Sequence, residues 1–370
     1  MQNAITTLRI QNFKSIKDVT MQPRRVNIII GEPNVGKSNI LEALSLLGGI
    51  FFDKAEGRFM DGQLRYETVR NLFYDNDWAQ EITVTGEGVG TTRLRKKEEG
   101  VEVIFKNDVI KRHLAAAMRD DVEHGSEYRE ESNVAVDFER SRQFHKVLKA
   151  DGQTSLYEAD KSLPSFQVKK YAFYKQTSHG KSYYESFLRP PHGDNLLEVI
   201  RAAPSAFKKE IGAFFTPFGL NLALRPEELE VQKNVEGVIT AIPYALVADT
   251  LQRLIFYLAA IESNTDSVLL FEEPEAHSFP QYVLHLAQNI VESSSNQFFI
   301  VTHSPYLITE ILEEMLLDEE LKPELAMFAA YYEDYQTKVN QLTDEDIYNV
   351  RRDGLDVFFN MRRFVPETDL

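Results

Sequence analysis

The stretch Asn27-Ile28-Ile29-Ile30-Gly31-Glu32-Pro33-Asn34-Val35-Gly36-Lys37-Ser38 decides the fold of this chain. A run of apolar, mostly β-branched residues stops at Gly31, and Gly-Lys-Ser follows after four intervening residues. Residues 39–44 then have the composition of a helix. A G-x-x-x-x-G-K-[ST] motif between a strand and a helix is typical of a loop that binds nucleotide phosphates. The alternative is a glycine turn that precedes an ordinary helix.

Each residue type in this loop suits phosphate binding. Gly31 and Gly36 allow the backbone to curl so that its N–H groups point at phosphate oxygens, and the helix N-terminus near Lys37 adds its positive dipole end. Lys37 supplies a point charge for the β- and γ-phosphates, and the Ser38 hydroxyl ligates Mg²⁺. We therefore predict that ATP and Mg²⁺ bind here. The predicted nucleotide contacts in the loop are Gly31, Glu32, Pro33, Asn34, Val35, Gly36, Lys37, Ser38 and Asn39.

The composition of the 370-residue chain is that of an ordinary globular protein, with 43% hydrophobic and 26% charged residues. No apolar run is long enough to span a membrane, and the N-terminus lacks a signal-peptide pattern, so we expect a cytoplasmic protein without a membrane segment. The absence of cysteine excludes disulfides and thiolate metal sites.

The formal net charge of −16 weighs against binding to nucleic acid. Nucleic-acid binding would require a local basic patch or a basic partner. The candidate patches are Arg93, Arg95, Lys96 and Lys97, and, further along the chain, Lys169, Lys170 and Lys175. Scattered, solvated cations are the alternative interpretation of both groups.

Strand-like and helix-like runs alternate along most of the chain, which predicts an α/β protein with a mixed central sheet flanked by helices. Residues 81–105 alternate apolar and polar positions and predict an antiparallel meander, and residues 109–118 predict a helix in the same inserted arm. We also predict one helix from Asp194 or Asn195 to Ile211, and another over residues 246–263.

These patterns divide the chain into four predicted parts. Residues 1–50 and 166–325 are expected to form the two halves of a nucleotide-binding head. Residues 51–165 are expected to form an inserted lobe. Residues 326–370 are expected to add a strand pair and short helices that pack on the head.

A second motif, Val268-Leu269-Leu270-Phe271-Glu272-Glu273-Pro274, places two carboxylates at the end of a buried strand. Ligands of open α/β sheets bind at this edge. Glu272 is placed to hold Mg²⁺, directly or through water. Glu273 is placed to orient and deprotonate the water that attacks the γ-phosphate. The alternative is a glutamate pair at a helix cap.

The third motif is Thr302-His303-Ser304, at the end of another apolar strand. A histidine in this position can contact the γ-phosphate and sense its loss. A single histidine is more often a surface or core residue, so this assignment depends on the order of the three motifs.

This ordered set resembles the ABC-type ATPases of the SMC, RecF and OLD branch, as a head domain without the long coiled coil. The segments that carry the resemblance are residues 8–16, 31–44, 271–277 and 301–307, with a weaker similarity over 188–196. The resemblance implies the P-loop fold of such a head, Mg²⁺-dependent ATP hydrolysis, and an ATP-bound homodimer in which two heads sandwich two nucleotides.

In that family a signature loop of one head faces the γ-phosphate of the other. The resemblance places this loop at residues 247–253, with Asp249 and Thr250 where the family has a Ser-Gly pair. An aspartate facing phosphate is unfavourable unless a cation or a helix N-terminus offsets it. Pro33 and Glu272 are further departures, from Asn and Asp respectively. The family also uses a metal-binding glutamine at the arm junction, which points to Gln176.

Three functions remain open from the sequence. In the first, the protein hydrolyses ATP and drives or gates a separate effector subunit, such as a nuclease, in defence against phage. In the second, it is an ATP-gated scaffold or sensor with little turnover. In the third, it is an ATPase of DNA repair or chromosome structure, which its net charge disfavours. The effector and the defence role rest on the resemblance alone.

Overall fold

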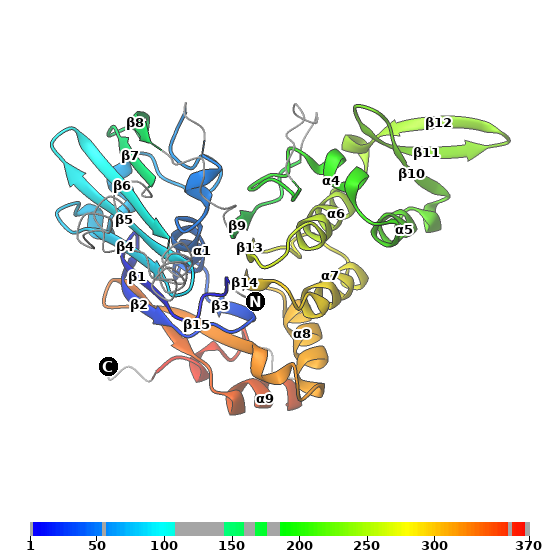
Figure 1. Ribbon diagram of the computed structural model, residues 1–370. Coiled ribbons are helices and arrows are strands. Elements are labelled where there is room, and N and C mark those ends of the chain that lie inside the picture. Colours follow the sequence, from blue (N-terminus) through cyan, green and yellow to red (C-terminus); the bar gives the residue numbers. More distant parts are fainter. Residues whose placement is uncertain are drawn as a thin grey trace, which may run out of the picture.

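The computed structural model describes residues 3–53, 57–107, 144–158, 167–175, 186–353 and 357–366. Within these residues the chain builds a six-stranded mixed sheet, a seven-stranded antiparallel sheet and a small three-stranded sheet. Figure 1 shows the two large sheets on either side of one helix, with a layer of helices beyond the six-stranded sheet.

The order of the six-stranded sheet is β16-β15-β3-β14-β13-β9, and all of its strands are parallel except the edge strand β16. Its core strands are fully buried because both faces are covered, which explains their continuous apolar sequences. The strands are β3 (Val26–Gly31), β9 (Val168–Tyr171), β13 (Val268–Glu272), β14 (Gln297–Val301), β15 (Leu325–Glu333) and β16 (Gln336–Gln341).

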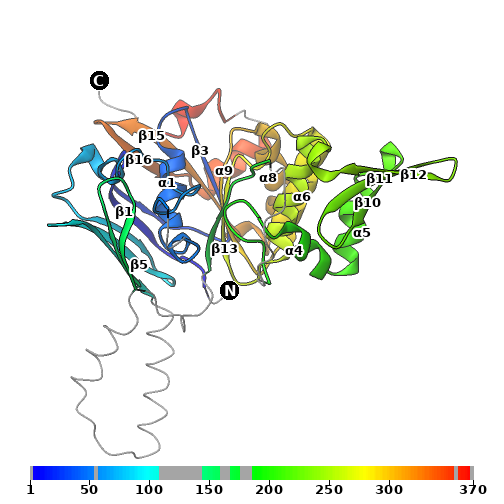
Figure 2. The same cartoon turned by 90° about the horizontal axis from the view of Figure 1, so that it is seen from above.

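Helix α1 (Lys37–Ser45) lies between the two large sheets (Figures 1 and 2). Its apolar side chains, such as Ile40 and Leu44, share one core with both sheets. The antiparallel sheet has the order β2-β1-β4-β5-β6-β7-β8. Its strands are β1 (Leu8–Phe13), β2 (Ile16–Met21), β4 (Ile82–Gly86), β5 (Gly90–Lys97), β6 (Gly100–Asn107), β7 (Phe144–Leu148) and β8 (Thr154–Glu158).

The opposite face of the six-stranded sheet packs on a second core formed with helices. Figure 1 shows α6, α7 and α8 along this face, and the small sheet projecting beyond α4 and α5. The helices are α4 (Leu196–Ala202), α5 (Ser205–Ala213), α6 (Asp249–Glu262), α7 (Pro280–Glu292), α8 (Pro305–Leu317) and α9 (Asp344–Arg352). The small sheet consists of β10 (Leu220–Leu224), β11 (Leu229–Val235) and β12 (Val238–Pro243).

The predicted α/β class with a mixed central sheet is confirmed. The single helix predicted over residues 194–211 is wrong, because Pro204 lacks an amide hydrogen and the chain is extended at Ala203, so α4 ends and α5 begins there. The helix predicted from residue 246 begins at Asp249. Residues 109–118, predicted to be helical, lie outside the described residues.

The antiparallel sheet crosses the predicted boundary between residues 50 and 51. Strand β1 pairs with β2 on one side and with β4 on the other, where Ile10 lies opposite Val84. Edge strands tend to recruit further strands, and here β4 completes the hydrogen bonds of β1. The part predicted as an inserted lobe therefore extends a sheet that begins in the first 21 residues. Within the described residues, no helix is long and apolar enough to cross a membrane.

We predict that Phe298→Ala lowers the free energy of unfolding by about 3–5 kcal/mol, because a large buried ring leaves a cavity. Phe298 is fully buried in β14, and its ring centroid lies 5.9 Å from that of Phe271. The control is Phe359→Ala, since Phe359 is 91% exposed, and it should change stability by no more than about 0.5 kcal/mol. Urea denaturation measures both, and equal losses would contradict this account of the core.

Candidate functional site

Three loops that carry the predicted motifs leave the same edge of the six-stranded sheet. Strands β3, β14 and β13 are adjacent and parallel, so their carboxyl ends meet. The phosphate loop begins at Gly31, the last residue of β3. Glu272 ends β13 and Glu273 follows it, and Thr302 and His303 follow β14. The topology therefore brings the phosphate loop next to two motifs that lie more than 200 residues further along the sequence.

The phosphate loop has the backbone geometry that its glycines predict. Gly36 adopts a φ of 95° directly before α1, and Asn34 adopts a φ of 65°, both in the left-handed region. Lys37 is buried, and its ammonium donates hydrogen bonds to the carbonyl oxygens of Gly31 at 2.9 Å and Glu32 at 2.7 Å. The lysine charge is thus held inside the curl of the loop.

Two distant segments hold the phosphate loop from outside. The Thr337 hydroxyl donates a hydrogen bond to the Val35 carbonyl at 2.8 Å and lies 2.6 Å from the Ser15 hydroxyl. The Asn39 amide in turn donates to Ser15 at 2.7 Å. A β-carbon on Gly36 would lie 2.1 Å from the Thr337 hydroxyl oxygen, so only glycine fits. Sequence reasoning missed both hydroxyls: Ser15 lies in a segment that carried the family resemblance, but no pattern marks Thr337.

Burial lowers the pKa of Lys37 to about 8, although the carboxylate of Glu273 opposes this shift. Lys37 is therefore poised between its charged and neutral forms near physiological pH, and an anion placed against it would favour the charged form.

Glu272 has cationic partners on two sides. One of its oxygens lies 3.2 Å from the Lys170 ammonium, and the other lies 3.5 Å from the Arg65 guanidinium. Burial alone would raise the pKa of Glu272, but Lys170, the Ser38 hydroxyl and Arg65 together hold it below its usual value. The carboxyl group is consequently ionised and available as a ligand.

The donor set around Ser38 and Glu272 fits Mg²⁺. One hydroxyl and one carboxylate are oxygen ligands, and Mg²⁺ at nucleotides commonly takes only one or two protein carboxylates beside phosphates and water. Across the described residues no group of three His, Cys, Asp or Glu side chains could hold a metal ion. Ser38 and Glu272 would therefore supply two of the oxygen ligands that Mg²⁺ takes beside phosphate and water.

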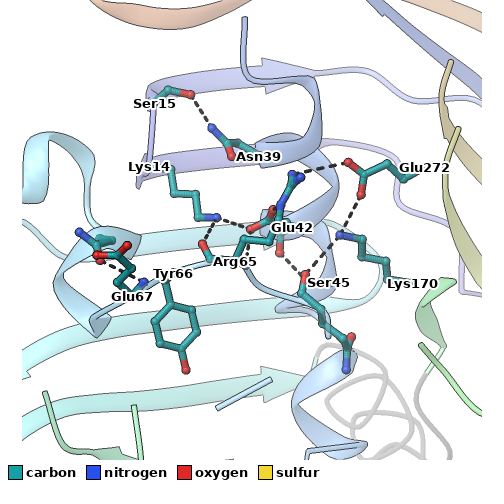
Figure 3. A network of polar contacts seen from close by, with 12 residues as sticks. Lys14, Ser15, Asn39, Glu42, Ser45, Arg65, Tyr66, Glu67, Lys170 and Glu272 are labelled. Carbon is teal, nitrogen blue, oxygen red and sulfur yellow. Dashed lines mark hydrogen bonds and ion pairs between the residues drawn. The ribbon is translucent and has the colours of Figure 1, made fainter. Parts of the chain in front are cut away.

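An ion network around the buried Glu42 supports this corner of the site (Figure 3). Glu42 of α1 is fully buried; it pairs with Lys14 and accepts a hydrogen bond from the Arg65 guanidinium at 2.7 Å. Lys14 also donates to the Arg65 carbonyl at 2.6 Å. Arg65 therefore connects the phosphate-loop helix to Glu272. Sequence reasoning assigned no role to Arg65 and placed Lys170 only in a candidate basic patch, because neither residue lies in a recognisable motif.

Glu273 and His303 face each other. The Glu273 carboxylate lies 3.7 Å from Nε2 of His303. Glu273 has a φ of 44°, a conformation that is uncommon for this residue type, and its amide donates to the Val301 carbonyl at 2.8 Å. Burial lowers the pKa of His303, Lys37 lowers it further and Glu273 opposes both, so the imidazole is favoured in its neutral form.

Asp249 and Thr250 form the first turn of α6. The Asp249 carboxylate pairs with the Lys175 ammonium at 2.6 Å, and the Thr250 hydroxyl donates to the His277 carbonyl at 2.8 Å. A cation and a helix N-terminus thus accompany this aspartate, which are the two conditions under which it can face a phosphate. Gln176, predicted as a metal ligand, lies outside the described residues.

The two candidate basic patches are largely neutralised or buried. Lys169 and Lys170 are each only 3% exposed, so they offer no surface charge to nucleic acid. In the other group, Arg93 pairs with Glu81, Arg95 and Lys97 pair with Glu102, and Lys96 stacks over the Trp78 ring. The structure therefore adds nothing in favour of direct nucleic-acid binding.

Comparison with solved structures returns SMC head domains at low identity. One is an SMC head bound to the C-winged helix domain of ScpA, with 15% identity, a TM-score of 0.46, and coverage of 92% of this chain and 98% of that one. Another is the SMC head domain from Thermotoga maritima, with 12% identity, a TM-score of 0.41, and coverage of 92% and 99%.

Two sequence comparisons add to the geometry. A curated relative from Helicobacter pylori, named ATP/GTP phosphatase, is 21% identical over 356 residues, which cover 89% of this chain and 93% of the relative. Residues 26–309 match the family described as "AAA domain, putative AbiEii toxin, Type IV TA system". This match covers about three quarters of the chain and contains all three motifs of the site. The chain therefore belongs to this AAA domain family and is a P-loop ATPase.

Proposed function

We propose that this ATPase hydrolyses ATP by attack of water on the γ-phosphate, with Mg²⁺ bound, while two copies pair head to head around two nucleotides. The observation that carries the proposal is the convergence at one sheet edge of a buried lysine, an ionised carboxylate and a facing Glu–His pair. These are the charges and the base that phosphoryl transfer to water requires.

In this proposal the loop of residues 31–39 and Lys37 bind the phosphates. Lys37 leaves the carbonyl oxygens of Gly31 and Glu32 and pairs with phosphate instead. Ser38 and Glu272 would hold Mg²⁺, which when bound neutralises charge on the phosphate oxygens. Glu273 accepts the proton of the attacking water.

His303 acts beside this base. Its imidazole, 3.7 Å from the Glu273 carboxylate, donates a hydrogen bond to the γ-phosphate and loses that contact when inorganic phosphate leaves. The products are ADP and phosphate.

Pairing of two heads is supported by the first turn of α6. Asp249 and Thr250 lie at a helix N-terminus, and Lys175 balances the aspartate charge at 2.6 Å. The first turn of α6 can therefore face the γ-phosphate of an ATP bound by a second copy, although the Ser-Gly pair of the related ATPases is absent.

The biological output we propose is control of a separate effector protein in a toxin–antitoxin or phage-defence system. The support is the description of the family, which names a putative AbiEii toxin of a type IV toxin–antitoxin system. An ATP-gated switch with little turnover would serve the same output, and the rate of phosphate release separates the two.

We predict that Glu273→Gln lowers kcat by about 10²–10⁴-fold, the usual contribution of a positioned base, while ATP still binds. Stalled hydrolysis should retain the closed pair, so the solution mass of this variant should double when MgATP is added. Light scattering measures the mass, and phosphate release measures kcat. Lys37→Ala is the control that should bind no ATP and stay at the lower mass. Phosphate release equal in the wild type and in Lys37→Ala would contradict hydrolysis by this site.

We predict that the Kd for ATP rises only about twofold between pH 7 and 8 and then approaches a tenfold rise per pH unit well above pH 8. The reason is the lowered pKa of Lys37, about 8. Above that pH the lysine of the free protein is neutral and must take up a proton when it pairs with phosphate. The matched control is Lys37→Arg, whose guanidinium stays charged throughout and should remove the slope. A wild-type Kd that does not change up to pH 10 would show that Lys37 keeps its charge without nucleotide.

We predict that tagged Glu273→Gln, expressed in its native cells, co-purifies with a second protein in a fixed ratio, because it keeps the ATP-bound form. The Lys37→Ala variant should lose that protein if the contact depends on ATP. Mass spectrometry of the eluates identifies the partner and its ratio. Recovery of this chain alone from both variants would count against control of an effector.

A further inference from the structure

Glu275 is a buried carboxyl group beside the site for which the hydrolysis chemistry gives no role. It is only 7% exposed and lies two residues after the proposed base. Its Oε1 accepts a hydrogen bond from the Thr302 hydroxyl at 2.5 Å and another from the His303 amide at 3.3 Å. Glu275 therefore joins the loop after β13 to the turn that carries His303.

Further hydrogen bonds within residues 302–307 stabilise the turn that carries His303. The Thr302 hydroxyl accepts from the Ser304 amide at 2.9 Å, and the Ser304 hydroxyl accepts from the Leu307 amide, which caps α8. In the other direction, the Glu273 amide donates to the Val301 carbonyl at 2.8 Å. Hydrogen bonds therefore link the loop after β13 to the loop after β14 on both sides of the facing Glu273 and His303 side chains.

We propose that Glu275 is a positioning residue that fixes the His303 backbone relative to Glu273. The imidazole can then contact the γ-phosphate while Glu273 accepts the proton of the water that attacks it. The proposal rests on the function proposed above for these two residues. Glu275 acts through the Thr302 hydroxyl and the His303 amide.

The buried carboxyl group of Glu275 is only partly satisfied by hydrogen bonds. Burial raises its pKa above the usual value, although the Thr302 hydroxyl and the His303 amide oppose the shift. Among the described residues, its buried Oε2 has no hydrogen-bond partner. An uncompensated polar atom costs stability, and an apolar side chain would fill the same place at lower cost. A role in the geometry of the site explains why a carboxyl group stands here.

The test compares Glu275→Leu, which removes the acceptor at similar size, with Glu275→Gln, which keeps a neutral acceptor oxygen. We expect Glu275→Leu to lower kcat on the order of 10²-fold, as a misplaced catalytic group does, while KM stays within about twofold. Glu275→Gln should restore kcat to near the wild-type value. If Glu275→Leu keeps the wild-type kcat, or if Glu275→Gln loses as much as Glu275→Leu, the proposal is overturned.

Two controls separate positioning from general loss of stability. Asn264→Leu removes a similarly buried side chain that bonds Tyr171 and the end of α6, away from the three loops, and it should leave kcat unchanged. In a His303→Ala background, Glu275→Leu should add almost no further loss, because both changes remove the same contribution. Fully additive losses would show that Glu275 does not act through His303.

A spectroscopic measurement distinguishes failure of this inference from failure of the proposed function. In nitrogen-15 NMR of ring-labelled histidine, the His303 signal is assigned by its disappearance in His303→Gln. It should shift in Glu275→Leu and keep its position in Glu275→Gln, whether or not the wild type releases phosphate. A His303 signal that does not move in Glu275→Leu overturns the positioning role, even if hydrolysis is confirmed. A signal that does move in Glu275→Leu, when the wild type releases no phosphate, supports the positioning role and rejects only the hydrolysis.

Discussion

The close approach of Gly36 to Thr337 and Ser15 determines where the phosphate loop lies. There is no room for a β-carbon at Gly36, and the Thr337 hydroxyl bonds directly to the Val35 carbonyl. The position of the loop therefore depends on contacts with Thr337 of the β15–β16 hairpin and Ser15 of the β1–β2 turn. Once the loop is placed, α1 runs between the two large sheets and the remaining core packs around it.

Charge is distributed very unevenly in this acidic protein. The chain carries a net charge of −16, yet Lys37, Lys170, Arg65 and Lys14 gather beside the phosphate loop. Glu42 pairs with Lys14 and Arg65, and Glu272 pairs with Lys170 and Arg65, which lowers the cost of holding these charges together. Lys37 instead donates to the backbone carbonyls of Gly31 and Glu32. An incoming polyphosphate thus meets local cations inside a surface that repels nucleic acid on average.

Much of the fold was predictable from the sequence because apolar strands and glycine-rich turns are local signals. The runs ending at Gly31, Phe271 and Val301 mark the buried strands of the site. The supporting residues were not predictable in the same way. Arg65, Lys170 and Thr337 reach the site from segments without a motif, and their contacts follow only from the sheet order. The extension of β1 by β4 depends on pairing of distant strands, which a local pattern cannot specify.

The order of strands in the six-stranded sheet has a consequence for synthesis of the chain. Strand β3 is made within the first 31 residues, but its two neighbours, β14 and β15, begin at residues 297 and 325. A growing chain emerges from the ribosome N-terminus first, so this apolar strand emerges more than 250 residues before either of its hydrogen-bonding partners. The loop that follows β3 gains its hydrogen bond from Thr337 only after β16 has been made. In a nascent chain this apolar strand therefore stays unpaired until β14 and β15 have been made, and the phosphate loop lacks its outside support until Thr337 has followed.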